Sequence, residues 1–277
     1  MNWLFNKNII LSGASSGIGK EIVKILVSKP YNCKVLGLAR TETKLQELKE
    51  ELNTENFIYF PMDASVKENW AKLKTHIKEI NFMPDILVNN AGRMHSFMAT
   101  KKIPLETIEN VMAVNFYSVV YSVEELLDVI LESKTPAIIN ICSSSALCTV
   151  PGVAGYSASK SAVKAYSETL AIDLKGKAYV STIFPGVTTT NIFNSKDNKE
   201  PIINEKDKSI VDFISTDATK MAKKIVKTIK KKKRRKVLGW DAKLMNFGYK
   251  LMPNGVPKII NGVFKKSKKD SFKDIYN

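Results

Sequence analysis

The chain has 277 residues, of which 44% are hydrophobic and 25% are charged, a composition that is ordinary for a globular protein. Its 3 cysteines include no CxxC pair, which argues against a zinc site and a disulfide framework and predicts reduced thiols in a cytoplasmic compartment. No apolar run reaches the roughly 18 residues that a membrane-spanning helix needs, and the N-terminus does not resemble a signal peptide.

The formal net charge of +16 is distributed unevenly along the chain. Residues 1–219 carry 24 basic and 24 acidic side chains, whereas residues 220–277 carry 19 basic and 3 acidic ones. The entire excess of positive charge therefore lies in the last fifth of the chain. We expect the two segments to have different roles.

Apolar, β-branched runs alternate with segments of helical periodicity along most of the chain. The runs predict six strands and a shorter seventh, at 7–11, 33–39, 57–61, 85–90, 137–142, 179–184 and 236–240. The segments between them predict helices at 17–28, 41–53, 66–80, 106–132 and 157–175. Because the strand runs are continuously apolar, their sheet is expected to be buried on both faces. This pattern predicts an α/β fold that is doubly wound, with a mostly parallel seven-stranded sheet and helices on both faces.

The turn after the first predicted strand is rich in glycine. It reads SGASSGIG (12–19) and leads directly into the first predicted helix. Glycines permit a tight turn and a close approach of a pyrophosphate, which the N–H groups at the start of a helix then bind. A plain tight turn is the alternative, and a Walker-type loop is disfavoured because no Gly-Lys-Ser/Thr sequence follows. The candidate cofactor-binding residues here are Gly13, Ser15, Ser16, Gly17, Ile18 and Gly19.

The end of the second predicted strand, LGLAR, indicates which dinucleotide binds. A carboxylate at this place would bind the ribose 2′-hydroxyl of NAD(H), whereas an arginine accommodates the 2′-phosphate of NADP(H). Ala39 occupies the position of the carboxylate, and Arg40 follows it. We therefore expect NADP(H) in preference to NAD(H). The alternative is that Arg40 is a solvated loop cation.

The segment YSASK places Tyr156 and Lys160 four residues apart, and therefore on one face of a predicted helix. An amphipathic helix with an exposed lysine is one interpretation of this spacing. In the other, the ammonium lowers the pKa of the phenol from its usual value near 10, and Tyr156 becomes an acid–base catalyst.

Four features occur in order along the chain: SGASSGIG, NNAG (89–92), a serine cluster after the fifth predicted strand, and YSASK. Together they resemble the short-chain dehydrogenase/reductase family in its compact, single-domain form, over about residues 5–190. Ser12 stands where the family usually has threonine, and Cys142 replaces the first serine of the usual pair. The resemblance implies a Rossmann-type fold and an enzyme that uses a nicotinamide cofactor.

The resemblance also implies catalytic roles for four residues. Tyr156 would transfer the proton, Lys160 would assist it and bind the ribose of the cofactor, and Ser143 would hydrogen-bond the substrate oxygen. Asn115 would hold a water molecule near the lysine. Further cofactor contacts are implied beside the adenine, in the cleft after the fourth strand and beyond the sixth strand, at Asp63, Asn89, Ala91, Gly92, Pro185, Gly186 and Thr190.

The activity that the resemblance implies is NADP(H)-dependent interconversion of a ketone or aldehyde and an alcohol. Two alternatives stay open, a cofactor-sensing binding protein without turnover and an NAD(H)-dependent alcohol dehydrogenase. No metal site is expected, because His76 and His95 have no second histidine or acid in register. The family is commonly a homodimer or homotetramer, through helices that correspond to 106–132 and 157–175.

We expect residues 1–235 to form the oxidoreductase domain, with residues 191–219 covering the substrate. Residues 236–277 would add the last strand and a basic amphipathic extension. Apolar and basic residues mixed in this way can contact an anionic membrane at its inner surface, which would suit an apolar substrate. They can equally pack on the domain, form an oligomer contact or be solvated. Nucleic-acid binding is disfavoured, because the basic run has little aromatic interleaving and no nucleic-acid-binding motif.

Overall fold

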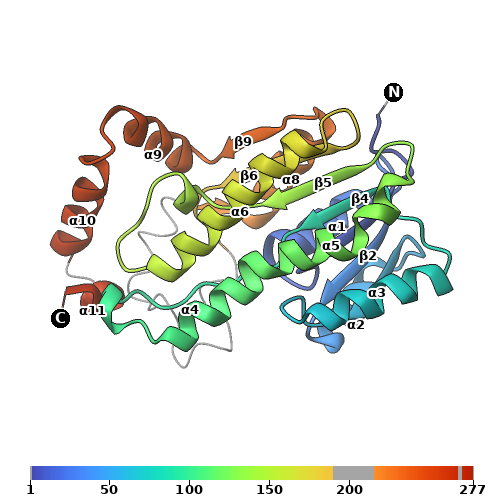
Figure 1. Cartoon of the computed structure of the whole chain (residues 1–277), viewed down its shortest axis with the longest axis horizontal. Coiled ribbons are helices and arrows are strands. Elements are labelled where there is room, and N and C mark those ends of the chain that lie inside the picture. The colour runs from blue at the N-terminus through green and yellow to red at the C-terminus, as the bar shows by residue number, and fades with distance from the viewer. Residues whose placement is uncertain (1, 190–214, 268–269, 277) are drawn as a thin grey trace.

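The computed structural model describes residues 2–189, 215–267 and 270–276 (Figure 1). Seven strands form one sheet in the order β3-β2-β1-β4-β5-β6-β9, and every pairing described within it is parallel. The predicted doubly wound α/β fold is thereby confirmed. The strands are β1 (Asn8–Ser12), β2 (Lys34–Ala39), β3 (Phe57–Pro61), β4 (Ile86–Asn89), β5 (Ala137–Ile141), β6 (Tyr179–Pro185) and β9 (Arg235–Leu238).

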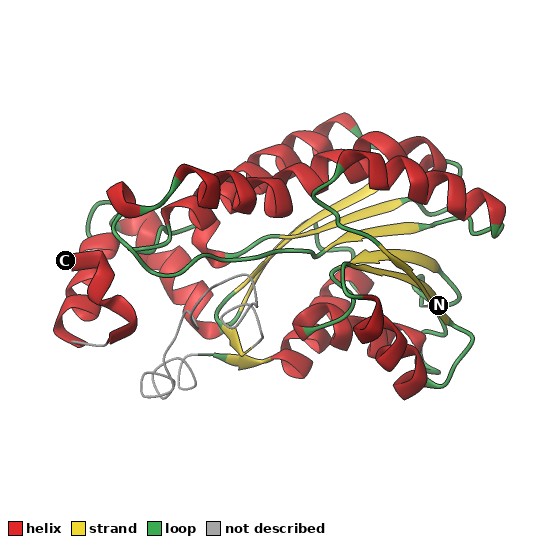
Figure 2. Ribbon diagram, turned by 90° about the horizontal axis from the view of Figure 1, so that it is seen from below, coloured by secondary structure: helices red, strands yellow, loops and turns green. Residues whose placement is uncertain are grey.

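Helices cover both faces of the sheet, as Figure 2 shows. The two layers are α1 (Gly17–Val27), α2 (Glu42–Leu52) and α8 (Ala218–Lys230) on one face, and α3 (Lys67–Glu79), α5 (Ser118–Leu131) and α6 (Ala154–Asp173) on the other. Neighbouring residues of β1 illustrate the division, because Ile9 is buried in the first layer and Ile10 in the second. Burial on both faces explains why the strand segments are continuously apolar.

The chain reverses its direction across the sheet between β1 and β4. From β1 it proceeds outward through β2 and β3, and then returns to β4 on the other side of β1. The carboxyl ends of the two central strands are joined, because the Ser12 hydroxyl accepts hydrogen bonds from the backbone N–H groups of Asn90 and Ala91, each at 3.1 Å. Open parallel sheets bind ligands at such a reversal, so this edge is where we expect the site.

Two helices differ from their predicted bounds. The predicted helix 106–132 consists of α4 (Leu105–Met112), a π-helical turn at Ala113–Tyr117 and α5. The predicted helix 157–175 corresponds to α6, which begins earlier, at Ala154. Single π-helical turns inside helices frequently occur at functional sites. This one carries Asn115, which is completely buried.

The helix α8 belongs to the core. Its apolar residues Met221, Ala222, Ile225, Val226 and Ile229 are buried against the layer that contains α1. The apolar stripe of α8 is therefore part of the hydrophobic core. Just before α8, β8 (Thr216–Asp217) pairs with β7 (Thr188–Thr189), and residues 191–214 of the predicted substrate-covering segment lie outside the described residues.

The remaining helices form one end of the molecule (Figure 1). They are α9 (Trp240–Leu251), α10 (Val256–Ser267) and the short α11 (Lys273–Tyr276). Among the described helices of the whole chain, none is both long enough and apolar enough to cross a bilayer.

Candidate active site

Glycine is required at three places in the turn between β1 and α1. Gly13 and Gly17 have φ values of +72° and +51°, which residues with side chains rarely adopt, and a Cβ on Gly19 would overlap the carbonyl oxygen of Gly13. Ser16 is the N-cap of α1, but its side chain makes no capping hydrogen bond, which suits an anion at the first N–H groups of the helix. The turn therefore fits a pyrophosphate and brings together Gly13, Ser15, Ser16, Gly17, Ile18 and Gly19.

The two asparagines at the end of β4 point in opposite directions. Asn90 faces the glycine turn, where its amide donates to the carbonyl oxygens of Ser12 at 3.1 Å and Gly13 at 3.2 Å. Asn89, a predicted cofactor residue, points into the interior and donates to the Asn140 side chain at 2.9 Å. Asn90 is therefore the side chain that holds the turn, although our sequence prediction did not single it out. The alternation of side chains along a strand is the signal that distinguishes the two.

The first turn of α6 and the end of β5 bring Tyr156 and Ser143 together. Tyr156 is buried, and the side chain of Ser143 lies near enough to its phenol to lower the pKa of Tyr156. The Ser143 oxygen also accepts hydrogen bonds from the N–H of Ser145 at 3.2 Å and from the Ser145 hydroxyl at 3.0 Å. Because Ser143 accepts both of these bonds, its own proton can be donated toward the phenol.

Lys160 lies one helical turn beyond Tyr156 and is only 4% exposed, so the interpretation as an exposed lysine is wrong. Its ammonium donates to the carbonyl oxygen of Ile141, at the end of β5, at 3.2 Å. A Cβ on Gly92 would lie 3.3 Å from this nitrogen and 3.3 Å from Oδ1 of Asn115, so glycine keeps space beside the ammonium. Burial lowers the pKa of Lys160. A buried ammonium with space beside it fits the hydroxyl groups of a cofactor ribose.

Asn115 clamps the segment after β4 to α6. Its Oδ1 accepts from the N–H of Arg93 at 2.8 Å, and its Nδ2 donates to the carbonyl oxygen of Arg93 and to the hydroxyl of Ser159, each at 2.9 Å. Both amide hydrogens are therefore used within the protein. By holding Arg93, the side chain positions the neighbouring Gly92 beside the ammonium of Lys160. Ser159, which completes this clamp, was not among the predicted residues.

Burial controls the protonation of Tyr156. Burial raises the pKa of Tyr156 to about 12. Ser143 lowers this pKa, and Cys142 raises it further. The lowering that we expected from Lys160 is not found in this arrangement, because desolvation of the phenolate dominates and the ammonium is directed at Ile141. Tyr156 is therefore a protonated phenol at neutral pH.

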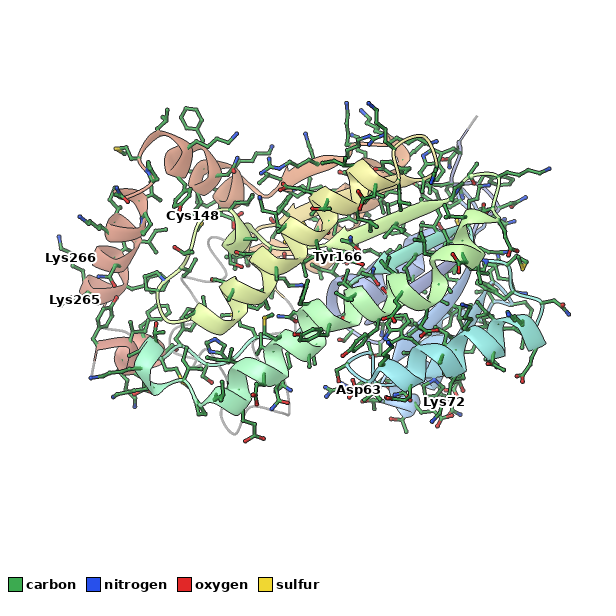
Figure 3. The ribbon with its side chains drawn as sticks, viewed as in Figure 1. Asp63, Lys72, Cys148, Tyr166, Lys265 and Lys266 are labelled. Atoms are coloured by element: carbon green, nitrogen blue, oxygen red, sulfur yellow. The ribbon has the colours of Figure 1, made fainter. Side chains whose placement is uncertain are left out.

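The other predicted cofactor residues lie along the same carboxyl edge of the sheet. Arg40 directly follows β2 and is exposed. Asp63 follows β3 (Figure 3), and its Oδ1 accepts from the N–H and the hydroxyl of Ser65 at 2.8 and 2.6 Å. Pro185 is the last residue of β6, and the N–H of the following Gly186 donates across to β9.

Asp241 braces the turn after β6, a role that the sequence did not predict. It lies in α9, is 6% exposed, and accepts a hydrogen bond from the N–H of Val187 at 2.7 Å. A Cβ on either Gly186 or Gly239 would overlap its carboxylate. Thr190, the predicted contact to the nicotinamide, lies outside the described residues.

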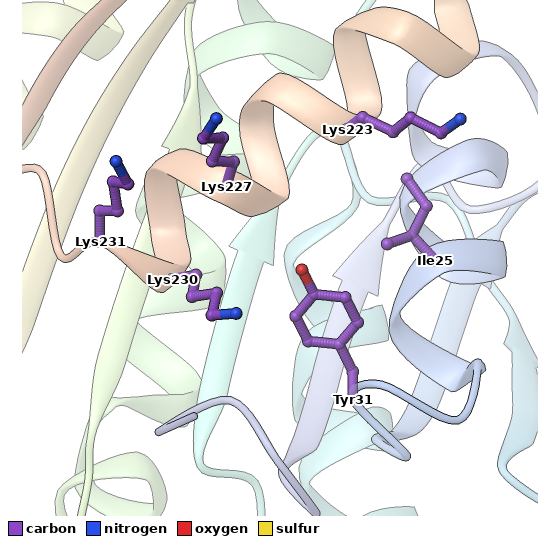
Figure 4. A pocket seen from close by; sticks show the side chains of 6 residues that line it. All are labelled: Ile25, Tyr31, Lys223, Lys227, Lys230 and Lys231. Carbon is purple, nitrogen blue, oxygen red and sulfur yellow. The ribbon is translucent and has the colours of Figure 1, made fainter. Parts of the chain in front are cut away.

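Two further observations concern the described part of the chain away from Tyr156. Within it, no group of three or more His, Cys, Asp and Glu side chains is arranged to hold a metal ion. A shallow hollow lies against the α1–α8 layer, on the opposite face of the sheet from Tyr156. It is lined by Ile25, Tyr31, Lys223, Lys227, Lys230 and Lys231 (Figure 4).

Comparisons with known proteins agree with this geometry. The family model described as short chain dehydrogenase matches residues 7–201. The 11-beta-hydroxysteroid dehydrogenase 1A of Arabidopsis thaliana is 28% identical over 246 residues, which cover 83% of this chain and 68% of that protein. The NADPH-dependent pterin aldehyde reductase of the same plant is 27% identical over 190 residues, covering 68% and 78%. A short-chain dehydrogenase from Burkholderia phymatum, solved with NAD, has a TM-score of 0.75 at 21% identity, over 86% of this chain and 90% of that one.

The glycine turn at the reversal of a parallel sheet defines a nucleotide-binding protein of the Rossmann type, and Tyr156 and Ser143 close to a buried lysine are typical of an oxidoreductase. The chain belongs to the short-chain dehydrogenase/reductase family. It is accordingly an oxidoreductase for alcohol or carbonyl groups of a small molecule, with the nicotinamide cofactor typical of that family.

Proposed function

We propose that the protein is an NADP(H)-dependent oxidoreductase that interconverts a carbonyl and an alcohol on an apolar substrate, with Tyr156 as proton donor and acceptor. The observation that carries this proposal is the burial of Tyr156 beside Ser143, one helical turn from the buried ammonium of Lys160. When bound, the cofactor would supply the hydride. The N–H groups at the start of α1 would hold its pyrophosphate, and Lys160 would hold its ribose.

In the direction of reduction, Tyr156 gives its proton to the substrate oxygen as negative charge develops there. Its pKa of about 12 keeps the phenol protonated at neutral pH, so the proton is present before the reaction starts. Ser143 donates a hydrogen bond to the same oxygen, and then to the phenolate that remains. Asn115 acts as a positioning residue, because it fixes the segment that lies over Lys160.

The side chains around Tyr156 favour an apolar substrate. The phenol belongs to a cluster of buried apolar residues, the others being Met94, Phe97, Val111, Val153 and Phe272. A polar substrate would lose its hydration in such surroundings without gaining hydrogen-bonding partners, whereas an apolar one gains free energy by leaving water.

Arg40 supports NADP(H) as the cofactor. A guanidinium at this edge can pair with a 2′-phosphate through two parallel hydrogen bonds, and Ala39 before it offers no carboxylate to a ribose hydroxyl. The relatives include both kinds, since one is named as NADPH-dependent and one was solved with NAD. The choice therefore depends on this residue.

Fluorescence titration of the purified protein with NADPH and with NADH tests the cofactor. We expect NADPH to bind at least roughly tenfold more tightly than NADH. One charge-assisted hydrogen bond to the 2′-phosphate contributes enough free energy for such a difference. Arg40→Asp should abolish or reverse the preference, whereas Lys44→Asp, an exposed lysine of the neighbouring helix α2, should leave it unchanged. Tighter binding of NADH by the native protein would contradict the NADP(H) assignment, and binding of neither would contradict the dinucleotide site.

A cofactor-sensing protein without turnover is the second candidate. The complete arrangement of Tyr156, Ser143 and Lys160 disfavours it, because a sensor needs no proton donor. We expect Tyr156→Phe to lower the rate of reduction of apolar ketones about a hundredfold to ten-thousandfold and to leave NADPH binding unchanged. Tyr166→Phe, on the same helix, is the matched control (Figure 3). Equal rates for Tyr156→Phe and the native protein would leave the sensor as the better description.

A further inference from the structure

The outward face of α9 is apolar, the reverse of what a helix at a protein surface normally shows. Trp240, Leu244, Phe247 and Leu251 follow one another at spacings of four, three and four residues, so they form one stripe along the helix. Their exposed fractions are 53%, 63%, 62% and 65%. Large apolar side chains exposed singly are ordinary, but a continuous stripe of four indicates an interaction surface.

The stripe continues beyond α9. Met252 directly after it, and Ile259 and Val263 on α10, are 53%, 59% and 60% exposed. The same surface carries a set of exposed lysines, of which Figure 3 shows Lys265 and Lys266 at the outer edge of α10. The set consists of Lys243, Lys250, Lys258, Lys265 and Lys266. We call this combination of apolar stripe and lysines the α9–α10 face.

The inward side of the same helices is packed, which fixes the direction of the outward side. Asp241 and Ala242 of α9 are buried. Phe264 of α10 stacks on Phe272, with ring centroids 4.2 Å apart, and each of these rings forms an edge-to-face pair with Phe97. Rotation of α10 to hide Ile259 and Val263 would expose these aromatic rings instead. The outward face is therefore not a part of the hydrophobic core that a small rotation of the helices would bury.

We propose that the α9–α10 face docks on the surface of an anionic lipid membrane. Its two components match the two layers that such a surface offers. The apolar stripe can enter the acyl boundary, and the lysines around it can pair with lipid phosphates, each contributing to the attraction. The helices are too short to span the bilayer, so the contact lies in the plane of the interface.

Two other occupants would match only one of the two components of the α9–α10 face. A second copy of this chain would bring the five lysines against five more, and the described residues of the two helices offer one acid, Asp241, which is buried. A nucleic acid would satisfy the lysines but would leave the aliphatic Leu244, Leu251 and Val263 in water, because its backbone is polar. An anionic lipid surface satisfies both components.

Co-sedimentation of the full chain with vesicles tests the docking. We expect binding to vesicles of phosphatidylcholine with phosphatidylglycerol, much weaker binding to phosphatidylcholine alone, and a decrease as salt is added. The double variant Leu244→Ser/Phe247→Ser should bind roughly tenfold more weakly or worse, since two large apolar side chains no longer enter the lipid. Its matched control is Phe5→Ser/Met83→Ser, which removes two side chains that are 48% and 49% exposed elsewhere.

The lysines have a separate test. Lys243→Gln/Lys250→Gln should weaken binding to the anionic vesicles roughly tenfold and leave binding to phosphatidylcholine vesicles unchanged. Lys72→Gln/Lys74→Gln, on α3, is the control and should bind as the native chain does. Far-UV circular dichroism and thermal melting confirm that each variant is folded, independently of any enzyme activity.

Three results would overturn the proposal. The first is equal binding of the native chain and Leu244→Ser/Phe247→Ser to anionic vesicles. The second is conversion of a larger assembly into a smaller one by that variant, which would make the α9–α10 face a contact between copies. The third is release of the native chain from vesicles by a short DNA duplex at equal phosphate concentration, which would indicate a nucleic-acid surface.

Discussion

Lys160 is a cation in the protein interior, and its burial opposes folding. Burial lowers its pKa, which means that the folded state disfavours the charged form relative to the unfolded chain. We expect Lys160→Met to abolish activity and yet to raise the free energy of unfolding by about 1 kcal/mol or more, as replacement of buried charges by apolar groups often does. Urea denaturation followed by circular dichroism measures the change.

The matched control for this variant lies on the same helix. Lys164 is partly exposed and pairs with Glu168 at 2.9 Å, so Lys164→Met removes a surface ion pair of little energy and should not stabilise the protein. A loss of stability in Lys160→Met that exceeds the loss in Lys164→Met would show that the buried ammonium supports the fold.

The raised pKa of Tyr156 predicts a pH dependence that differs between the two directions of reaction. Because the phenol stays protonated up to a pKa of about 12, carbonyl reduction, which needs the proton, should be nearly independent of pH from about 6 to about 9. Alcohol oxidation needs the phenolate and should rise over the same range. The pH profiles of kcat/KM, which report the free enzyme, measure both. A reduction rate that falls tenfold across this range would contradict the assignment of Tyr156.

The same shift affects stability at high pH. The folded pKa of Tyr156 lies above its unfolded value near 10, so between about 10 and about 12 the unfolded chain has lost the proton that the folded chain still holds. The contribution of Tyr156 to stability is therefore complete below pH 10 and is lost as the pH rises toward 12.

At the scale of elements, Asp241 couples α9 to the turn between β6 and β7. Gly186→Ala would push a methyl group into the carboxylate and cost about 1–3 kcal/mol. Asp241→Ala would leave the N–H of Val187 without its acceptor and cost a similar amount, about 1–3 kcal/mol. The double variant should cost less than the sum, because the methyl group no longer meets a carboxylate.

Thermal or urea unfolding of the four proteins in this cycle measures the coupling, which we expect to be about 0.5–3 kcal/mol. Additive losses would mean that Gly186 is required for the conformation of its own backbone and not for the space that Asp241 occupies.

The sequence predicted the features that depend only on residues close together in the chain. The spacing of Tyr156 and Lys160 and the position of the glycine turn are local properties, and both hold in the structure. Contacts across the fold were missed, such as that between Val187 and Asp241, which are 54 positions apart, because such pairing depends on strand order and loop paths. The π-helical turn was missed for another reason. The prediction treated residues 106–132 as one uninterrupted helix, although a π-helical turn interrupts it at Ala113–Tyr117.

Helical periodicity also does not say where an apolar face points. The stripe of α8, from Met221 to Ile229, and the stripe of α9, from Trp240 to Leu251, both recur at helical spacing and have lysines beside them. The first is core and the second is exposed. The difference arises because α8 returns to the sheet beside α1, whereas α9 follows the edge strand β9 away from it.

At the scale of the whole molecule, exposed apolar side chains on the helices of the α6 side predict an assembly. Leu105 on α4, Tyr117 in the π-helical turn and Ile172 on α6 are 69%, 44% and 74% exposed. We expect a homodimer or homotetramer through these helices, because burial of such residues between copies is favourable. Light scattering after size exclusion should give two or four times the chain mass of 31.0 kDa.

The variant Leu105→Glu/Tyr117→Glu should shift this mass toward that of the single chain, since it places charges in the contact. A single-chain mass for the native protein at micromolar concentration would exclude the assembly. The variant should keep its dinucleotide binding, because Leu105 and Tyr117 are exposed and are not among the residues proposed to hold the dinucleotide.

Because Ile275 packs against Gly152, one part of the site can form only after the residues near the C-terminus have been synthesised. Gly152 has no room for a side chain because Ile275 covers it, and Phe272 closes the cluster around Tyr156. A ribosome adds about 5–20 residues per second, so these last residues appear roughly 5 to 20 s after β6 is complete. During that interval Phe97 and Val153 lack their cover. A newly made chain therefore carries the glycine turn before it has the wall beside Tyr156.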